Sequence, residues 1–463
     1  MMRSLFSGVA GLKTHQTRMD VIGNNIANVN TTGYKAQSMT FSDLMYQTTQ
    51  AASGANPTTG VGGINARQIG LGAKTAAIKT NITTQGAAQN TNDPFDIMIT
   101  GDAFFIVSNG AQNFFTRDGS FYIDGAGNLA MTSTGYNVMG WQVDPTDPTA
   151  IKADVVTPLR IMTDANMTYP PAATTAARVS GIIDRNDTNV TGDGRILNLE
   201  FYDNQGYKYT ARMTVSSTAE DAEAGIFTVK LADILDVNGK SVLTNEDGTP
   251  KDGVSASILA ADGTTDLTAG ATLTFNTKNG AFTNIGDGNT AVGDNLILSF
   301  EGLPSFDQIS IDFSNTSNVS NNKASTIAPY RGDSKGNGAG RMVGKMSGIE
   351  IQKDGMIYAY YDNGQDKLVG QIAVATFANA SGLAKEGDNL YSATQNSGDF
   401  DGVGQDITAG GTGYMNTGVL EMSNVDLAGE FTEMITTQRG FQANSRIITV
   451  SDTLLEELTN LKR

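Results

Sequence analysis

The 463 residues of this chain exceed what one hydrophobic core usually holds, so we expect roughly two to four domains. Asp and Glu outnumber Lys and Arg by 48 to 31, and the net charge of −17 argues against nucleic acid or an anionic membrane as a partner. Cys is absent and His occurs once, which excludes disulfides and thiolate metal sites and leaves little for a His-based triad or zinc site.

The first segment predicts a long amphipathic helix. Its apolar residues follow one another at intervals of three, four or seven, a heptad-like stripe on a helix of roughly 25 residues. The stripe contains Leu5, Val9, Leu12, Met19, Ile22, Ile26 and Val29. His15 falls on the same stripe, and we interpret it as a packing residue instead of a ligand or a catalytic base.

The same segment does not have the pattern of a signal peptide. Its apolar run is short, is diluted by Ser and Gly, and is followed at once by basic residues without a small-residue cleavage site. No stretch of the chain reaches the ~18 consecutive apolar residues of a membrane span. We therefore expect a soluble chain that has no cleaved signal peptide.

Asn residues gather where the first helix should end, in "GNNIANVNTTGYK". Asn tolerates the left-handed conformation and bonds to nearby backbone, so Asn24, Asn25 and Asn28 suit a helix end that passes into an extended loop. Gly33 allows a turn. An Asn cluster beside an apolar stripe is also what fixes the register of an ordered helical interface.

Residues 31–89 are rich in Gly, Thr and Ala and predict an extended connector without its own core, or a flexible linker. Short alternating runs with Gly turns then predict β-structure at 90–148 and again at 326–397, where a hairpin turns at Asn363-Gly364. The two blocks could form one domain, with residues 398–424 as a second connector. The stretch between them, 149–325, predicts an inserted all-β domain with a hairpin about Gly206.

No motif in the chain supports an active site. The segment "DRNDTNVTGDG" lacks the Gly and Glu that a calcium loop needs at its sixth and twelfth positions. The Gly-rich "GNGAGRMVG" has no strand before it and no helix after it, so it is a poor phosphate or dinucleotide site. We expect no enzyme activity, no cofactor and no metal.

The C-terminal segment, 425–463, predicts a second long amphipathic helix, with Asn424 as its N-cap. Its stripe includes Leu427, Phe431, Ile435, Phe441, Ile448, Leu454, Leu455, Leu458 and Leu461. The two terminal helices can pair with each other as an antiparallel coiled coil, pack against copies of the chain, or do both. The fold class is therefore mixed α and β and multidomain, with paired terminal helices carrying nested all-β domains. Both stripes, with the Asn cluster, are the candidate self-assembly residues.

The two ends carry a resemblance to a known family. "SLFSGVAGLKTHQTRMDVIGNNIANVNTTGYK" and "GVLEMSNVDLAGEFTEMITTQRGFQANSRIITVSDTLLEELTNLK" closely resemble the shared termini of bacterial flagellar rod, hook and hook-associated axial proteins. The internal stretches "NITTQGAAQNTNDPFDIMITGDAFFIV" and "VGQIAVATFANASGLAKEGDNLYSATQNSG" look most like the hook members of that family.

The resemblance implies a structural subunit that polymerises into a curved hollow tube, a universal joint that transmits torque from rod to filament. It implies that the terminal helices, 1–30 and 425–463, line the tube, that neighbouring subunits order the connector, and that the β domains lie outside. It also implies export through the flagellar type III apparatus and an extracellular place in the flagellum. The implied partners are copies of the chain, the distal rod protein, the hook cap protein and the hook–filament junction protein.

Three other functions stay open at this point. A distal rod or other axial protein shares the termini, although the insertion at 149–325 is large for a rod subunit. An extracellular adhesin built on flagellar-type ends would use the insertion to bind a ligand. An enzyme is the third, which the absence of Cys and the single His disfavour.

Overall fold

The computed structural model describes residues 2–54, 60, 62–245, 247–287, 291–409 and 413–461. These residues form two compact units. Unit 1 contains residues 1–166, 348–360 and 366–463, and unit 2 contains residues 167–347 and 361–365. Unit 1 is therefore built from both ends of the chain, whereas unit 2 comes from its middle.

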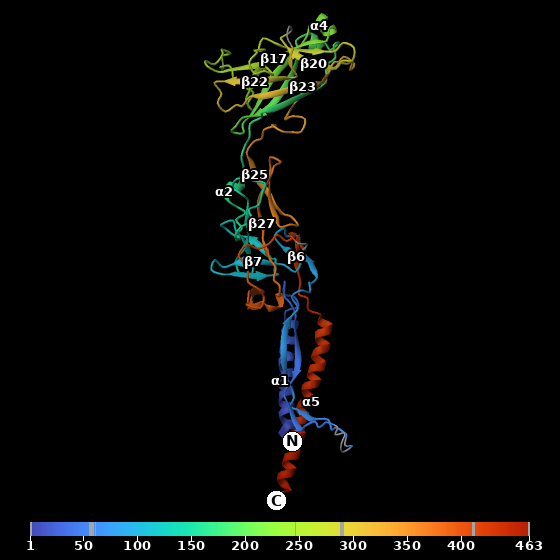
Figure 1. The fold of residues 1–463 in the computed structure, drawn as a ribbon. Helices are drawn as coiled ribbons and strands as arrows, with labels where there is room; N and C mark the ends of the chain where they lie inside the picture. The colour runs from blue at the N-terminus through green and yellow to red at the C-terminus, as the bar shows by residue number, and fades with distance from the viewer. Residues whose placement is uncertain are drawn as a thin grey trace. The chain divides into compact units, whose positions relative to one another are not determined.

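Two long helices at the chain ends lie side by side in unit 1 (Figure 1). Helix α1 spans Met2–Ala27 and helix α5 spans Leu427–Asn460. They run antiparallel, because Ser4 lies beside Ser451 while Asn25 bonds to Glu430. The antiparallel pairing expected from the two apolar stripes is confirmed.

The expected N-cap of the second helix was wrong. Asp426 caps α5, and its carboxylate accepts a hydrogen bond from the Ala428 amide at 3.0 Å. Asn424 instead accepts from the Ala36 amide at 2.7 Å and donates to the carbonyls of Asn81 and Thr84. A tertiary contact with the other end of the chain has taken the side chain that the local pattern assigned to capping.

The predicted connector contains more regular structure than its composition suggested. Strands β1 (Gln37–Asp43) and β4 (Ala73–Thr80) form one antiparallel pair, and β2 (Tyr46–Gln50) and β3 (Arg67–Gly70) form another. Most of their side chains are exposed, so the pairs have little core of their own. They are ordered by backbone ladders and by α1, against which β1 and β4 pack.

The main sheet of unit 1 joins the two predicted β blocks, since β11 pairs with β27. Its strands run in the order β26-β27-β11-β7-β8-β30-β29, and beyond β26 the sheet continues through β25 (Gly344–Ile351) to β13 (Thr168–Tyr169). They are β7 (Phe104–Ser108), β8 (Asn113–Thr116), β11 (Asn137–Gln142), β26 (Met356–Tyr361), β27 (Asp366–Ile372), β29 (Ala384–Gly387) and β30 (Leu390–Ser392). Shorter pieces adjoin it: β9 (Phe121–Ile123), β10 (Leu129–Met131), β12 (Thr157–Pro158), β28 (Val374–Ala375) and the 3-10 turn η1 (Ala380–Gly382).

Two further ladders bring the C-terminal connector back to the start of this domain. Strand β6 (Ile97–Gly101) pairs with β31 (Gly413–Thr417), and β5 (Ala88–Asn90) pairs with β32 (Val419–Glu421). The core beneath the sheet contains Phe104, Phe115 and the single Trp, Trp141. Chain segments more than 300 residues apart in the sequence are thus held in register by backbone hydrogen bonds.

Unit 2 is a sandwich of two sheets that share one hydrophobic core, which includes Phe201, Phe227 and Phe313. The five-stranded sheet has the order β18 (Ser255–Ala260), β22 (Asn295–Glu301), β23 (Ile309–Ser317), β14 (Ala176–Ile182) and β24 (Ala328–Arg331). The six-stranded sheet has the order β15 (Arg195–Tyr202), β16 (Lys208–Ser216), β17 (Ile226–Leu235), β19 (Ala271–Phe275), β20 (Phe282–Gly286) and β21 (Ala291–Gly293). The hairpin predicted about Gly206 is confirmed as β15–β16.

Remaining elements lie where the chain enters or leaves unit 2 or within its loops. Strand β13 (Thr168–Tyr169) pairs with the start of β25 (Gly344–Ile351). The short helices are α2 (Asp164–Met167), α3 (Thr188–Thr191) and α4 (Ala219–Glu223). The segments through which the chain enters and leaves unit 2 are thus neighbours in one β-ladder.

The edges of the compact middle unit differ from the predicted insertion, 149–325. Strand β24 pairs with β14, and Ile327 beside it is buried, so residues 326–347 belong with unit 2. At the other edge β12 pairs with β11, which places residues 149–166 with unit 1.

These boundaries predict how isolated fragments will behave. A fragment of residues 167–347 should unfold cooperatively, whereas 149–325 lacks β24 and Ile327 and should be less stable by about 3 kcal/mol or more. Urea unfolding followed by circular dichroism measures both, and equal stability of the two fragments would contradict the assignment.

Candidate self-assembly site at the paired chain ends

Small and polar residues form most of the contact between the two terminal helices, and the Ile447 and Ile448 side chains lie beside Gly8. On α1 they are Gly8, Gly11 and Thr14, and on α5 they are Thr437, Gly440, Asn444 and Ser451. A Cβ on Gly11 would lie 2.6 Å from Asn444 Oδ1, and one on Gly440 would lie 2.6 Å from the His15 ring. These glycines therefore allow an approach that any larger residue would prevent. His15 packs in this contact and against the Phe41 ring, in agreement with its expected packing role.

The apolar and Asn residues predicted for self-assembly differ in how far their side chains are exposed. Ile22 and Asn25 are buried. Eight are half-buried: Leu5, Leu12, Met19, Ile26, Asn28, Val29, Ile448 and Leu455. Nine are exposed: Val9, Asn24, Leu427, Phe431, Ile435, Phe441, Leu454, Leu458 and Leu461. The exposed fraction reaches 51% for Phe431 and 59% for Ile435, and Ile447 and Val450 extend the same exposed face.

The Asn cluster fixes the turn from α1 into β1. Asn25 is fully buried, and its amide donates to the Gln37 carbonyl at 2.7 Å and to Glu430 at 2.8 Å. Its oxygen accepts from the Gln37 amide and from the Tyr34 hydroxyl. Asn28 bonds back to Asn24 within the last turn of the helix. One side chain thus holds the end of α1, the start of β1 and helix α5 together.

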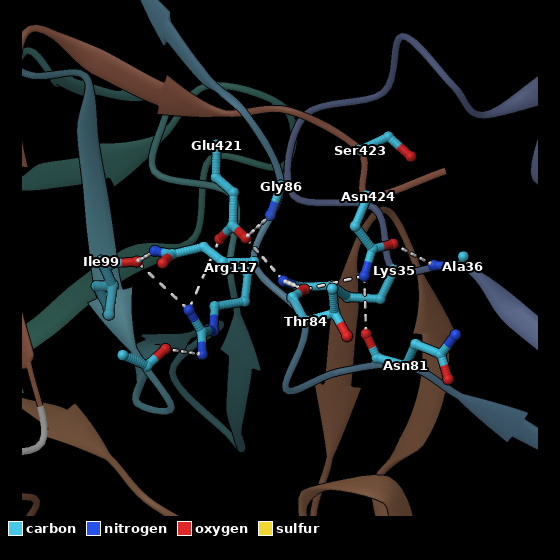
Figure 2. Close-up of polar contacts among 12 residues, drawn as sticks. Lys35, Ala36, Asn81, Thr84, Gly86, Ile99, Arg117, Glu421, Ser423 and Asn424 are labelled. Carbon is cyan, nitrogen blue, oxygen red and sulfur yellow. Dashed lines mark hydrogen bonds and ion pairs between the residues drawn. The ribbon is translucent and has the colours of Figure 1, made fainter. Parts of the chain in front are cut away.

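Three charged side chains that the sequence did not single out meet beneath this turn (Figure 2). Lys35 Nζ lies 2.7 Å from Glu421 Oε1, and Arg117 Nη1 lies 3.7 Å from Glu421 Oε2. The exposed fraction of each of the three side chains is 1% or less. We call this group the buried triad.

Neutral groups give the buried triad further hydrogen bonds, although Arg117 Nε and Glu421 Oε2 have no hydrogen-bond partner among the described residues. Lys35 also donates to the Thr84 carbonyl at 2.8 Å, and the Gly86 amide donates to Glu421 Oε1 at 2.9 Å. The Arg117 guanidinium donates to the Ile99 carbonyl (Figure 2). It also donates to the Gly101 carbonyl and lies over the Phe104 ring. Burial lowers the pKa of Lys35, and the neighbouring Glu421 carboxylate opposes that shift.

Each member of the buried triad comes from a different part of the chain. Lys35 follows α1, Arg117 follows β8, and Glu421 ends β32 just before α5. Gly33 passes this point with a φ of +66°, where a Cβ would lie 2.7 Å from the Asp118 amide. The buried triad therefore anchors both chain ends to the β domain of unit 1. In the sequence these residues resemble ordinary surface charges, and no spacing relates them, so sequence reasoning missed them.

Among the described residues no three metal-binding side chains gather in one place, and no helix is long and apolar enough to cross a membrane.

Comparisons with known proteins match both ends of the chain and one internal segment. Residues 5–35 match the family described as flagella basal body rod protein, 98–197 match the flagellar hook protein FlgE/F/G D1 domain, and 416–461 match the flagellar basal body rod FlgEFG protein C-terminal family. The chain is 34% identical to the flagellar hook protein FlgE of Treponema pallidum and 36% identical to that of Borreliella burgdorferi, over all of each chain. It is 28% identical to the flagellar basal-body rod protein FlgG of Bacillus subtilis, again over both full lengths.

The buried triad predicts the effect of removing its anion. Glu421→Gln leaves the Lys35 ammonium buried without a counter-charge, and we expect unit 1 to lose about 3–5 kcal/mol of unfolding free energy. The fluorescence of Trp141 reports unit 1 alone, because it is the single Trp of the chain. Glu433→Gln is the matched control, since its ion pair with Arg18 is exposed and should contribute about 1 kcal/mol or less. Equal losses in the two variants would contradict the role of the triad.

His15 predicts a pH dependence of the helix pair. Burial, and secondly the Arg18 charge, lower its pKa from the ordinary value of 6.5, so the folded state binds the proton less readily than the unfolded state. The contribution of neutral His15 to folding stability is therefore fully present above the ordinary pKa of 6.5 and is lost as the pH falls below it. Amide exchange in α1, corrected for its intrinsic pH dependence, should therefore speed up between about pH 7 and about pH 5.5 in the assembled protein. His15→Gln should abolish that change; its persistence would exclude His15 as the cause.

Proposed function

Because the chain belongs to the flagellar hook protein family, we propose that its paired terminal helices are the surfaces through which copies of it polymerise. The protein is a structural subunit of the bacterial flagellar hook, the curved hollow tube that acts as a universal joint and transmits torque from rod to filament.

The observation that carries the proposal is the exposed apolar face of α5. Phe431, Ile435, Leu454 and Leu458 are each about half exposed on one continuous helix, although the helix already has a partner in α1. Fully burying such a side chain is worth about 1.5–3 kcal/mol, so covering the exposed half of each is worth about half of that. Apolar residues exposed in this number along one helix indicate an interaction site. In a homopolymer, other copies of the same chain would cover these apolar side chains.

The Asn cluster and the buried triad have a supporting role in this proposal. Asn25 bonds α1, β1 and Glu430 of α5 in one network, and the triad joins the same junction to the β domain. Bonded in this way, the helix pair presents its apolar face in a set direction. A polymer needs that property, because a small error in orientation would accumulate from one subunit to the next.

We assign four parts to the chain by function. The helical core is 1–30 with 425–463, the connector is 31–89 with 398–424, the inner β domain is 90–148 with 326–397, and the outer β domain is the insertion 149–325. The compact unit 2 at 167–347 supports a somewhat later start and end for the outer part. In this proposal the helical core surrounds the export channel and the β domains form outer layers.

The proposed partners follow from a place between rod and filament. They are other copies of the chain, the distal rod protein, the hook cap protein and the hook–filament junction protein. The chain would leave the cell unfolded through the flagellar export apparatus without a cleaved signal peptide and would work outside the cell. Because assembly accounts for the features of unit 1, we propose no enzymatic activity.

A distal rod function is the main alternative, supported by the similarity to the FlgG protein of Bacillus subtilis. The higher identities to the two hook proteins favour the hook. Electron microscopy of the purified polymer distinguishes them, since a hook subunit should form curved tubes and a rod subunit straight ones. An adhesin would instead bind a glycan through unit 2 without polymerising.

Leu458 offers a direct test of the assembly surface. Leu458→Asp places a charge in a contact that recurs in every subunit, at a cost of several kcal/mol each, so we expect no polymer under conditions where the wild type assembles. Asn460→Asp is the control, because it adds one negative charge to an exposed polar position two residues away. The Trp141 unfolding transition should be unchanged in both variants. Normal polymerisation of Leu458→Asp would show that this face is not an assembly surface.

A further inference from the structure

Unit 2 contains a cavity of about 480 Å³ between the edges of its two sheets. Strand β24 is the last strand of the five-stranded sheet and β15 is the first strand of the six-stranded sheet. Among the described residues no β-ladder joins these two strands. The two strands nevertheless pack against each other, so the cavity lies beside the seam where the two sheet edges meet.

Two arginines give the cavity its chemical character. Arg178 of β14 donates to the Asp333 carbonyl at 2.7 Å, and its guanidinium lies over the Tyr330 ring. The Arg331 guanidinium lies over the Tyr202 ring, 4.7 Å from its centroid. Within the part of the chain that the structure describes, neither arginine has a carboxylate within ion-pair distance. We call this feature the arginine cavity.

The only carboxylate side chain lining the arginine cavity, Glu200, is already neutralised. Its Oε1 lies 2.7 Å from Lys208 Nζ, and both side chains are about half exposed at the rim. Each guanidinium lies over one Tyr ring, which restricts its movement and leaves N–H groups for an oxyanion. A carboxylate is the ligand that this fork geometry fits best.

We propose that the arginine cavity receives a carboxylate-bearing segment from the unit 2 of a second copy of the chain. This inference rests on the proposed function, because copies meet repeatedly only in a polymer. Charge supports this occupant: carboxylates outnumber basic residues in unit 2, and copies of a chain with a net charge of −17 repel one another unless some carboxylates meet cations. Tyr330, 49% exposed at the same edge, would be covered by the incoming segment.

A zero-length cross-link tests the contact directly. Arg331→Lys places an amine in the arginine cavity, and a carbodiimide joins that amine to a carboxylate only where the two touch. Polymers are assembled from equal amounts of unlabelled and ¹⁵N-labelled full-length variant, coupled, digested and analysed by mass spectrometry. We expect cross-links from the peptide that contains residue 331 to an Asp or Glu peptide, with half of them joining one labelled and one unlabelled chain.

Arg341→Lys is the matched control, because Arg341 is also stacked on a Tyr ring of unit 2 but does not line the cavity. It should give no such mixed-label product. If Arg331→Lys polymerises but its cross-links form only within single chains, or do not form at all, the inference is overturned while the proposed function stands. Failure of the wild type to polymerise would instead remove the proposed function.

Charge reversal provides a second, independent measurement. Arg178→Glu combined with Arg331→Glu should give polymers that dissociate at least about tenfold faster than polymers of Arg341→Glu, because carboxylates then face carboxylates. Monomer unfolding by circular dichroism establishes that unit 2 is intact in each variant. Equal dissociation rates in the two polymers would also overturn the inference.

Discussion

The ion pair between Lys35 and Glu421, with Arg117 beside it, is the interaction on which the rest of unit 1 depends. Its members come from the segment after α1, from the β domain, and from the segment before α5. Charges buried to this extent lose their hydration, and only partners at short distance compensate for that loss. The three segments therefore fold together or not at all, and the end of α1 and the start of α5 are both fixed on the β domain.

The terminal helices place mainly small residues in the contact between them, where most helix pairs place large apolar residues. Gly8, Gly11, Gly440 and Ser451 lie in the contact between α1 and α5, so the two backbones approach closely and leave room there for His15, Ile447 and Ile448. The Leu, Ile and Phe residues of α5 stay largely outside that contact. Within one chain the pair is held by close backbone packing and polar bonds such as Asn25 to Glu430. Its apolar residues remain available for contacts between copies.

The middle of the chain is a self-contained addition to this framework. Unit 2 has its own core of Phe and aliphatic residues, and its entry and exit strands pair directly, Thr168 with Lys345 and Tyr169 with Gly344. A domain attached through two adjacent strands can be enlarged or altered without moving the anchored helix pair. The two sheet edges that border the arginine cavity are part of that domain, so the contact proposed there is separate from the contacts of the terminal helices.

The amino-acid sequence by itself determined the periodic elements. The stripe from Leu5 to Val29 predicted α1 to within a few residues, and Gly206 and Asn363-Gly364 marked hairpins that exist. Such features are local, because a helix face or a turn depends on residues only a few positions apart. Tertiary structure alone decided which residues meet across the chain. Nothing near Glu421 in the sequence indicates that Lys35 and Arg117 surround it, and Asn424 left its expected capping role because distant backbone groups offered it better partners. The burial of a charge or an amide is set by the whole fold, and no short window of sequence contains that information.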